Sequence, residues 1–127
     1  MEQTMQFSVE GWWATDMFSF LSGEPAAFNI EALEDTSFLI LDKIGRDLIF
    51  EKIPGFERLM RILIENHLVA HQKRLNAALS LNAEERYLIF LKKYPDIVQR
   101  VPQHLVASYL GITPETLSRI RKNLISG

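Results

Sequence analysis

The chain has 127 residues, of which 47% are hydrophobic and none is cysteine. A chain of this length forms one ordinary domain or two small ones, and its apolar content suffices for a packed core. The lack of cysteine excludes disulfide bonds and thiolate metal sites. No apolar run is long enough to span a bilayer, and the N-terminal residues do not resemble a signal peptide, so we expect a cytoplasmic protein without membrane partners.

The net charge of −2 is unevenly distributed along the chain. Residues 82–127 carry seven Lys or Arg and four Asp or Glu, which gives a net charge of +3, so residues 1–81 carry −5. A basic segment beside an acidic one is a weak indication that the basic segment binds a polyanion.

Residues 7–42 are predicted to be rich in β-strands. Short apolar or aromatic runs at 18–20, 28–30 and 38–41 are typical of strands, and Ser22-Gly23-Glu24-Pro25 predicts a turn between the first two. Three or four strands do not easily close a sheet by themselves. We therefore expect an incomplete β unit with exposed edges.

Apolar residues recur with helical spacing from residue 56 to residue 81, without Gly or Pro, which predicts a helix about 39 Å long. Phe56, Leu63, Ala70 and Ala77 follow one another at intervals of seven, as in a coiled coil. This spacing predicts a homodimer, although the same apolar stripe could pack on its own domain. The predicted dimer interface consists of Phe56, Leu59, Met60, Leu63, His67 and Ala70.

Residues 103–125 are predicted to form two helices joined by a tight turn, after a helix that Asn82 caps at residues 83–94. Gly111 suits a left-handed backbone after the first helix, Thr113 caps the second, and Pro114 occupies its first position. Ala107 allows the two helices to approach closely. Each feature also occurs in ordinary helical hairpins, but their combination indicates a helix-turn-helix whose recognition helix, residues 114–124, enters the major groove of double-stranded DNA.

The outer face of the second helix carries side chains that suit DNA. Arg119 can donate two hydrogen bonds to guanine, and Glu115 can accept one from cytosine, although Glu115 would equally stabilise the positive end of the helix dipole. These two residues are the predicted base contacts. The predicted phosphate contacts are Thr113, Thr116, Ser118, Arg121 and Lys122, with a neighbouring acid as the alternative partner of Arg121.

Residues 110–121, Leu-Gly-Ile-Thr-Pro-Glu-Thr-Leu-Ser-Arg-Ile-Arg, resemble the turn and recognition helix of the Crp/Fnr superfamily of bacterial transcription regulators. Residues 83–88 resemble the helix that opens the DNA-binding domain of these proteins. Residues 56–81 resemble their dimerisation helix, and residues 11–41 resemble the last strands of their cyclic-nucleotide-type β-barrel.

The resemblance implies an α+β fold in three parts. These are a partial cyclic-nucleotide-binding-like β-barrel domain (1–53), a dimerisation helix (54–81) and a helix-turn-helix, winged-helix-like DNA-binding domain (82–127). It also implies further barrel strands before residue 7, so that the chain is shortened at its N-terminus.

The residues with which ligand-binding members of the family grip a cyclic nucleotide are not preserved. Their Gly-Glu pair is best matched here by Thr15-Asp16, and their Arg-Ser or Arg-Thr pair by Pro25-Ala26. No arginine remains for the cyclic phosphate, so a cyclic nucleotide is not the expected effector. Pro114 stands where some relatives carry a base-contacting Arg, so the target DNA sequence does not carry over.

Other functions have weaker support in the sequence. No nucleophile–base pair, Gly-rich phosphate loop or paired-carboxylate motif is found, so we do not expect an enzyme. His67 and His71 are four residues apart but supply only two ligands, so neither a metal nor a cofactor is expected. The alternative function is an effector-sensing or protein-interaction module whose helix-turn-helix does not bind DNA.

Overall fold

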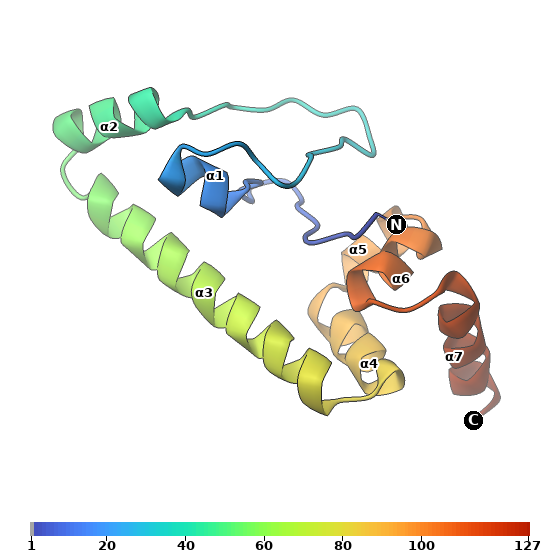
Figure 1. The fold of residues 1–127 in the computed structure, drawn as a ribbon. Coiled ribbons are helices and arrows are strands. Elements are labelled where there is room, and N and C mark those ends of the chain that lie inside the picture. The colour runs from blue at the N-terminus through green and yellow to red at the C-terminus, as the bar shows by residue number, and fades with distance from the viewer. Residues whose placement is uncertain (1) are drawn as a thin grey trace. The chain divides into compact units, whose positions relative to one another are not determined.

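A computed structural model describes residues 2–127 and shows seven helices over that range, with 63% of these residues helical. In chain order they are α1 (Met17–Ser22), α2 (Lys43–Lys52), α3 (Phe56–Ser80), α4 (Ala83–Lys93), α5 (Pro95–Arg100), α6 (Gln103–Leu110) and α7 (Pro114–Ser126), as Figure 1 shows. None of these helices has the length and hydropathy needed to cross a bilayer.

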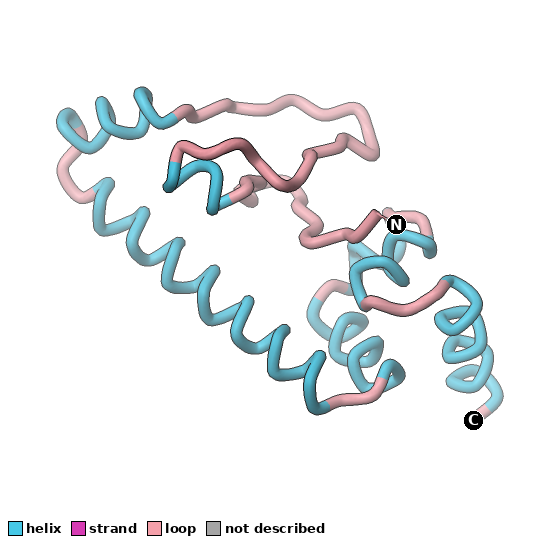
Figure 2. The backbone as a smooth tube through the Cα atoms, in the orientation of Figure 1, coloured by secondary structure: helices cyan, strands magenta, loops and turns pink. Residues whose placement is uncertain are grey.

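The α+β fold predicted from the sequence is wrong, because residues 2–127 contain no strand. The run at 18–20 lies in α1, and the runs at 28–30 and 38–41 lie in the long loop between α1 and α2 (Figure 2). This finding removes the partial cyclic-nucleotide-binding-like β-barrel domain from the described chain. Strands require a second backbone at hydrogen-bonding distance, and apolar alternation alone does not supply one.

A local hydrogen-bond pattern explains why α1 forms where a strand was expected. One carboxylate oxygen of Asp16 accepts a hydrogen bond from the Ser19 amide at 3.2 Å, which caps the helix. Its other oxygen accepts from the amides of Ala27 and Phe28 at 2.9 and 3.2 Å. These bonds fold the segment back on itself and lower the pKa of Asp16, with the Ser19 amide as the largest cause.

The chain divides into two compact units by its internal contacts. The first, which we call the helix-turn-helix unit, combines Met1–Trp13 with Leu75–Gly127. The second, the inserted unit, is Ala14–Arg74. Because the inserted unit interrupts the other one in sequence, the polypeptide connects the two units at residues 13–14 and again within α3 at residues 74–75.

The inserted unit is held together by a few aromatic and apolar contacts. The Phe50 and Phe56 rings pack at 5.5 Å between centroids across the bend between α2 and α3. The Arg46 guanidinium lies over the rings of Phe20 and Phe50, at 5.2 and 5.5 Å from their centroids. Met60 of α3 is buried.

The helix-turn-helix unit has a continuous hydrophobic core to which each of its complete helices contributes. The buried residues are Tyr87, Phe90, Ile97, Val106, Ala107, Leu117 and Ile120. Asn82 begins α4 with the capping box that the sequence predicted in part, since Asn82 and Glu85 each accept from the other's amide at 2.9 Å. Pro95 lies in the first turn of α5, where its missing amide proton is tolerated.

Candidate nucleic-acid interface

The turn between α6 and α7 is built as the sequence predicted. Gly111 follows α6 with a φ of 72°, in the left-handed region that favours glycine. The Gly111 amide donates to Ser108 O at 3.1 Å, and the Ile112 amide donates to Ala107 O at 3.0 Å. These bonds satisfy the last carbonyls of α6 while the chain reverses into α7.

The start of α7 is fixed by Thr113 and Pro114. The Thr113 hydroxyl oxygen accepts from the Thr116 amide at 3.1 Å, and the two threonine hydroxyls share a hydrogen bond of 2.9 Å. Pro114 fills the first helical position, where a missing amide proton costs nothing. The two threonine hydroxyls, predicted to contact phosphate, therefore form the cap of the helix in this structure.

One face of α7 is anchored in the core, which fixes the direction of the other face. Leu117 is 1% exposed and Ile120 is buried beside it. Val106 and Ala107 of α6 are completely buried against this face. Residues of α7 outside this inner stripe consequently point to solvent.

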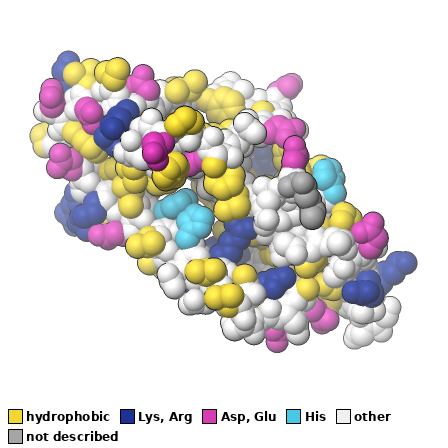
Figure 3. All heavy atoms as spheres, viewed as in Figure 1, with side chains coloured by type: hydrophobic (Ala, Val, Ile, Leu, Met, Phe, Trp, Pro, Cys, Tyr) yellow, Lys and Arg dark blue, Asp and Glu magenta, His cyan; other side chains and the backbone are white. Residues whose placement is uncertain are grey.

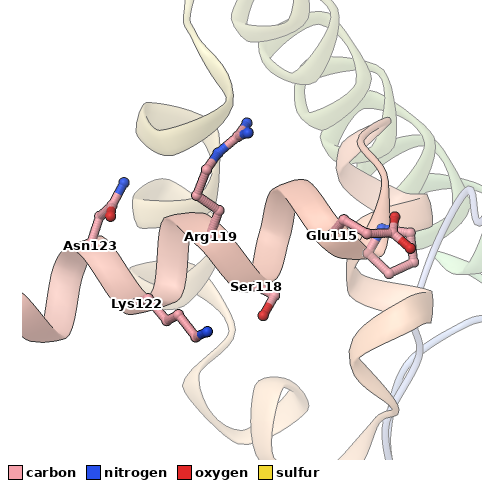
Figure 4. Close-up of a pocket in the computed structure, with 6 residues that line it drawn as sticks. Glu115, Ser118, Arg119, Lys122 and Asn123 are labelled. Carbon is pink, nitrogen blue, oxygen red and sulfur yellow. The ribbon is translucent and has the colours of Figure 1, made fainter.

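The predicted base contacts and two of the predicted phosphate contacts line one shallow groove of about 510 Å³ on the exposed face of α7. In Figure 4, Arg119 points to one side of the helix axis, whereas Ser118 and Lys122 point to the other. Glu115 lies at the start of the same helix (Figure 4). Arg121 is exposed but does not line the groove.

Two residues of this groove, Pro114 and Asn123, were not among the predicted DNA contacts. Asn123 follows Arg119 by four residues, and Figure 4 shows the two side chains on the same side of α7. The helical i, i+4 spacing was the signal that could have identified it, since such residues are neighbours on a helix surface. Asn123 is exposed, and an amide side chain can both donate and accept hydrogen bonds there.

The charges of α7 are available to a ligand. Within residues 2–127, the side chains of Glu115, Arg119 and Lys122 take part in no hydrogen bond or ion pair, and all three are exposed. Figure 3 shows basic side chains gathered over the region of α7. A helix face with more cations than anions, and with its cations unneutralised, attracts a polyanion.

Two other arginines of this unit make contacts within the protein. Arg86 donates from its two terminal nitrogens to Leu81 O at 3.3 Å and to Leu110 O at 3.1 Å, so it ties α4 to the end of α6. Arg100 forms an ion pair with Glu10 at 2.9 Å. The positive charge that the sequence assigned to residues 82–127 is thus divided between structural and exposed groups.

The predicted dimer residues occupy different environments on α3. Met60 is buried and Phe56 packs on Phe50, so both make contacts within their own unit. Leu59 and Ala70 are exposed, while Leu63 and His67 are partly buried. The helix also exposes apolar side chains outside the predicted set, namely Ile62, Leu68, Val69, Leu75 and Leu79.

His67 and His71 come together on α3, with 3.0 Å between their Nε2 atoms. Burial, followed by the nearby His67 and Arg74 charges, lowers the pKa of His71. No group of three potential metal ligands is found among residues 2–127.

The chain was also compared with known proteins. Comparison with models of protein families, with curated proteins and with solved structures finds no match to it.

Proposed function

We propose that this protein is a sequence-specific DNA-binding transcription regulator that acts as a dimer and inserts α7 into the major groove. The observation that carries this proposal is the exposed, unpaired Arg119 on a helix whose opposite face is locked into the core by Leu117 and Ile120. A recognition helix needs both properties, since base reading requires free donors on a rigid support. The resemblance of residues 110–121 to the Crp/Fnr recognition helix supports the same function.

The proposed roles of the α7 side chains, base contact or phosphate contact, follow from the directions in which they point. Arg119 donates two parallel hydrogen bonds to O6 and N7 of guanine, and Glu115 accepts from a cytosine amine. The two residues are separated by about 6 Å along the helix, which is roughly two base-pair steps. Ser118 and Lys122, on the other side of the axis, contact phosphate, and Arg121 contacts phosphate at the edge of the same surface.

The dimer is proposed to form through α3. Its 25 residues carry Leu68 and Leu75 at a spacing of seven, with Leu79 one turn further, and all three are largely exposed. Two recognition helices then reach half-sites about 34 Å apart. Light scattering at micromolar concentration should give twice the chain mass of 14.7 kDa. A stable monomer under these conditions would refute the dimer.

The test of base reading compares two substitutions on DNA selected by the wild-type chain from a pool of random duplexes. Arg119→Ala should cost about 1–3 kcal/mol per half-site on the selected DNA and much less on random DNA. Lys122→Ala should weaken binding to both DNAs alike and lower the salt slope by about one. Arg121→Ala is the matched control for the loss of an arginine from the same helix: as a proposed phosphate contact outside the groove, it should weaken binding to both DNAs alike.

The outcomes separate the proposed roles. If Arg119→Ala keeps the full preference for the selected DNA, Arg119 does not read a base. A wild-type chain that binds no duplex, even at low salt, would contradict the whole proposal and favour a protein-interaction role for the helix-turn-helix.

A further inference from the structure

The N-terminal segment of the chain is a structural part of the helix-turn-helix unit, although nothing in the proposed function uses it. Residues 2–12 are not helical and have no strand partner among the described residues. Met5, Phe7 and Val9 are partly buried, whereas Gln6 and Ser8 between them and Glu10 after them are exposed. An extended segment with this alternation presents one apolar side to a surface. We call residues 2–12 the strap.

The surface under the strap is aromatic and belongs to α4 and α6. The Phe7 ring lies 6.1 Å from the Phe90 ring, edge on, and 5.4 Å from the Tyr109 ring, between centroids. Val9 also packs against the core of this unit. The strap therefore covers core residues that solvent would otherwise reach.

Polar bonds fix the beginning of the strap on α6. The Thr4 amide donates to the Ser108 hydroxyl at 2.7 Å, and this hydroxyl donates to Glu2 O at 3.3 Å. Ser108 precedes by three residues the Gly111 turn, so the strap is bound to the last turns of the helix that supports α7.

The far end of the strap is held by an ion pair and a second aromatic contact. Glu10 accepts two hydrogen bonds from Arg100 of α5, at 2.9 and 3.2 Å. A turn follows, in which the Trp12 amide donates to Val9 O at 3.0 Å and Gly11 has a φ of 82°. The turn brings the Trp12 ring to 5.9 Å from the Tyr94 ring, edge on. The two-point hydrogen bond from Arg100 holds the pKa of Glu10 at about 2.

We propose that the strap is a releasable brace of the helix-turn-helix, and that its docking supports DNA binding. When docked, it holds α4, α5 and α6 together under α7. When released, it uncovers Phe90 and Tyr109, loosens the support of α7 and lowers the affinity for DNA. The strap ends where the inserted unit begins, at residues 13–14. The DNA part of this inference rests on the proposed function.

Docking itself can be observed without DNA, because the chain has only two tryptophans, Trp12 and Trp13. Trp13→Phe leaves Trp12 as the single reporter beside Tyr94. In that background, Arg100→Glu or Glu10→Arg should shift the Trp12 emission to the red and increase its quenching by acrylamide. The double reversal, Glu10→Arg with Arg100→Glu, should return both signals towards those of the parent.

One outcome of the Trp12 measurement would overturn the proposal. If Trp12 is equally accessible in the parent, both single reversals and the double reversal, the ion pair does not dock the strap and the proposal fails. Trp12→Ala and Trp13→Ala provide a second measurement that does not depend on charge. Both tryptophan residues are 48% exposed, but only Trp12 has a ring partner among the described residues. Only Trp12→Ala should lower the midpoint of thermal unfolding appreciably.

Control of DNA binding is tested with a substitution that leaves the charge unchanged. Phe7→Ala should weaken binding to a duplex by about fivefold or more, at the low end of couplings between sites. Phe28→Ala, which removes a half-exposed phenylalanine of the inserted unit without ring contacts, is the matched control and should have no effect. Equal affinities of these two variants would overturn the coupling. A wild-type chain that binds no duplex would instead refute the proposed function, while the Trp12 measurements would still decide whether the strap docks.

Discussion

Leu117 is the residue on which the orientation of the recognition helix depends most directly. It is 1% exposed and lies in the core between α6 and α7. Leu117→Ala removes three carbon atoms from this site, which corresponds to roughly 2.4 kcal/mol of lost burial. The cavity that remains adds to this cost, so we expect a loss of about 3–4 kcal/mol in the free energy of unfolding.

A loss of this size is large for so small a unit. At about 0.05–0.15 kcal/mol per residue, the helix-turn-helix unit should be stable by roughly 3–10 kcal/mol. Leu117→Ala should therefore shift the urea midpoint strongly, and it could unfold the unit at room temperature. Trp12 and Trp13 both belong to this unit, so their fluorescence during urea unfolding reports its stability separately from that of the inserted unit.

Ile125→Ala is the matched control for this experiment. Ile125 lies on the same helix but is 85% exposed, so its truncation should change the free energy of unfolding by less than about 0.5 kcal/mol. If Leu117→Ala costs less than about 1 kcal/mol, or no more than Ile125→Ala, then α7 is not anchored through Leu117. The assignment of the outer face of α7 would fall with it.

Three further predictions concern individual residues of the same unit. The folded pKa of Glu10 is lowered from 4.5 to about 2, so its pairing with Arg100 stabilises the fold fully above pH 4.5 and is lost as the pH falls towards 2. Trp12 fluorescence should change over this pH range, and Glu10→Gln should abolish the change. Gly111→Ala should cost about 1 kcal/mol by thermal unfolding, from left-handed strain alone, because an added Cβ would meet no atom within 4 Å; a stabilised variant would contradict the turn geometry. Asn82→Ala should also cost about 1 kcal/mol by urea unfolding, and an unchanged midpoint would show that the capping box contributes nothing.

The sequence by itself determined the local architecture of the candidate site. The Asn82 cap, the left-handed Gly111, the Thr113 cap and the Pro114 start all form as predicted, because each depends on residues within a few positions along the chain. The inward and outward faces of α7 follow from the helical period in the same way. The two groove residues that were not predicted as contacts, Pro114 and Asn123, are neighbours of predicted contacts on that helix.

The β-strands predicted within residues 7–42 do not form, because strands depend on distant residues and not only on near ones. A strand is stable only when a distant backbone pairs with it, and the apolar runs at 28–30 and 38–41 have no such partner among residues 2–127. The resemblance to a barrel-containing family favoured this prediction, but no segment pairs with these runs among residues 2–127. At 17–22 the Asp16 cap favoured a helix.

Only the tertiary structure decided the place of the strap. The alternation of Met5, Phe7 and Val9 with polar residues is visible in the sequence and indicates that one side of the segment is covered. It does not reveal the covering surface, because Phe90 and Tyr109 lie more than 80 residues further along the chain. Local preferences fix which helices form. Contacts between residues so far apart depend on how the whole core packs, and that packing joins residues 2–12 to the helix-turn-helix.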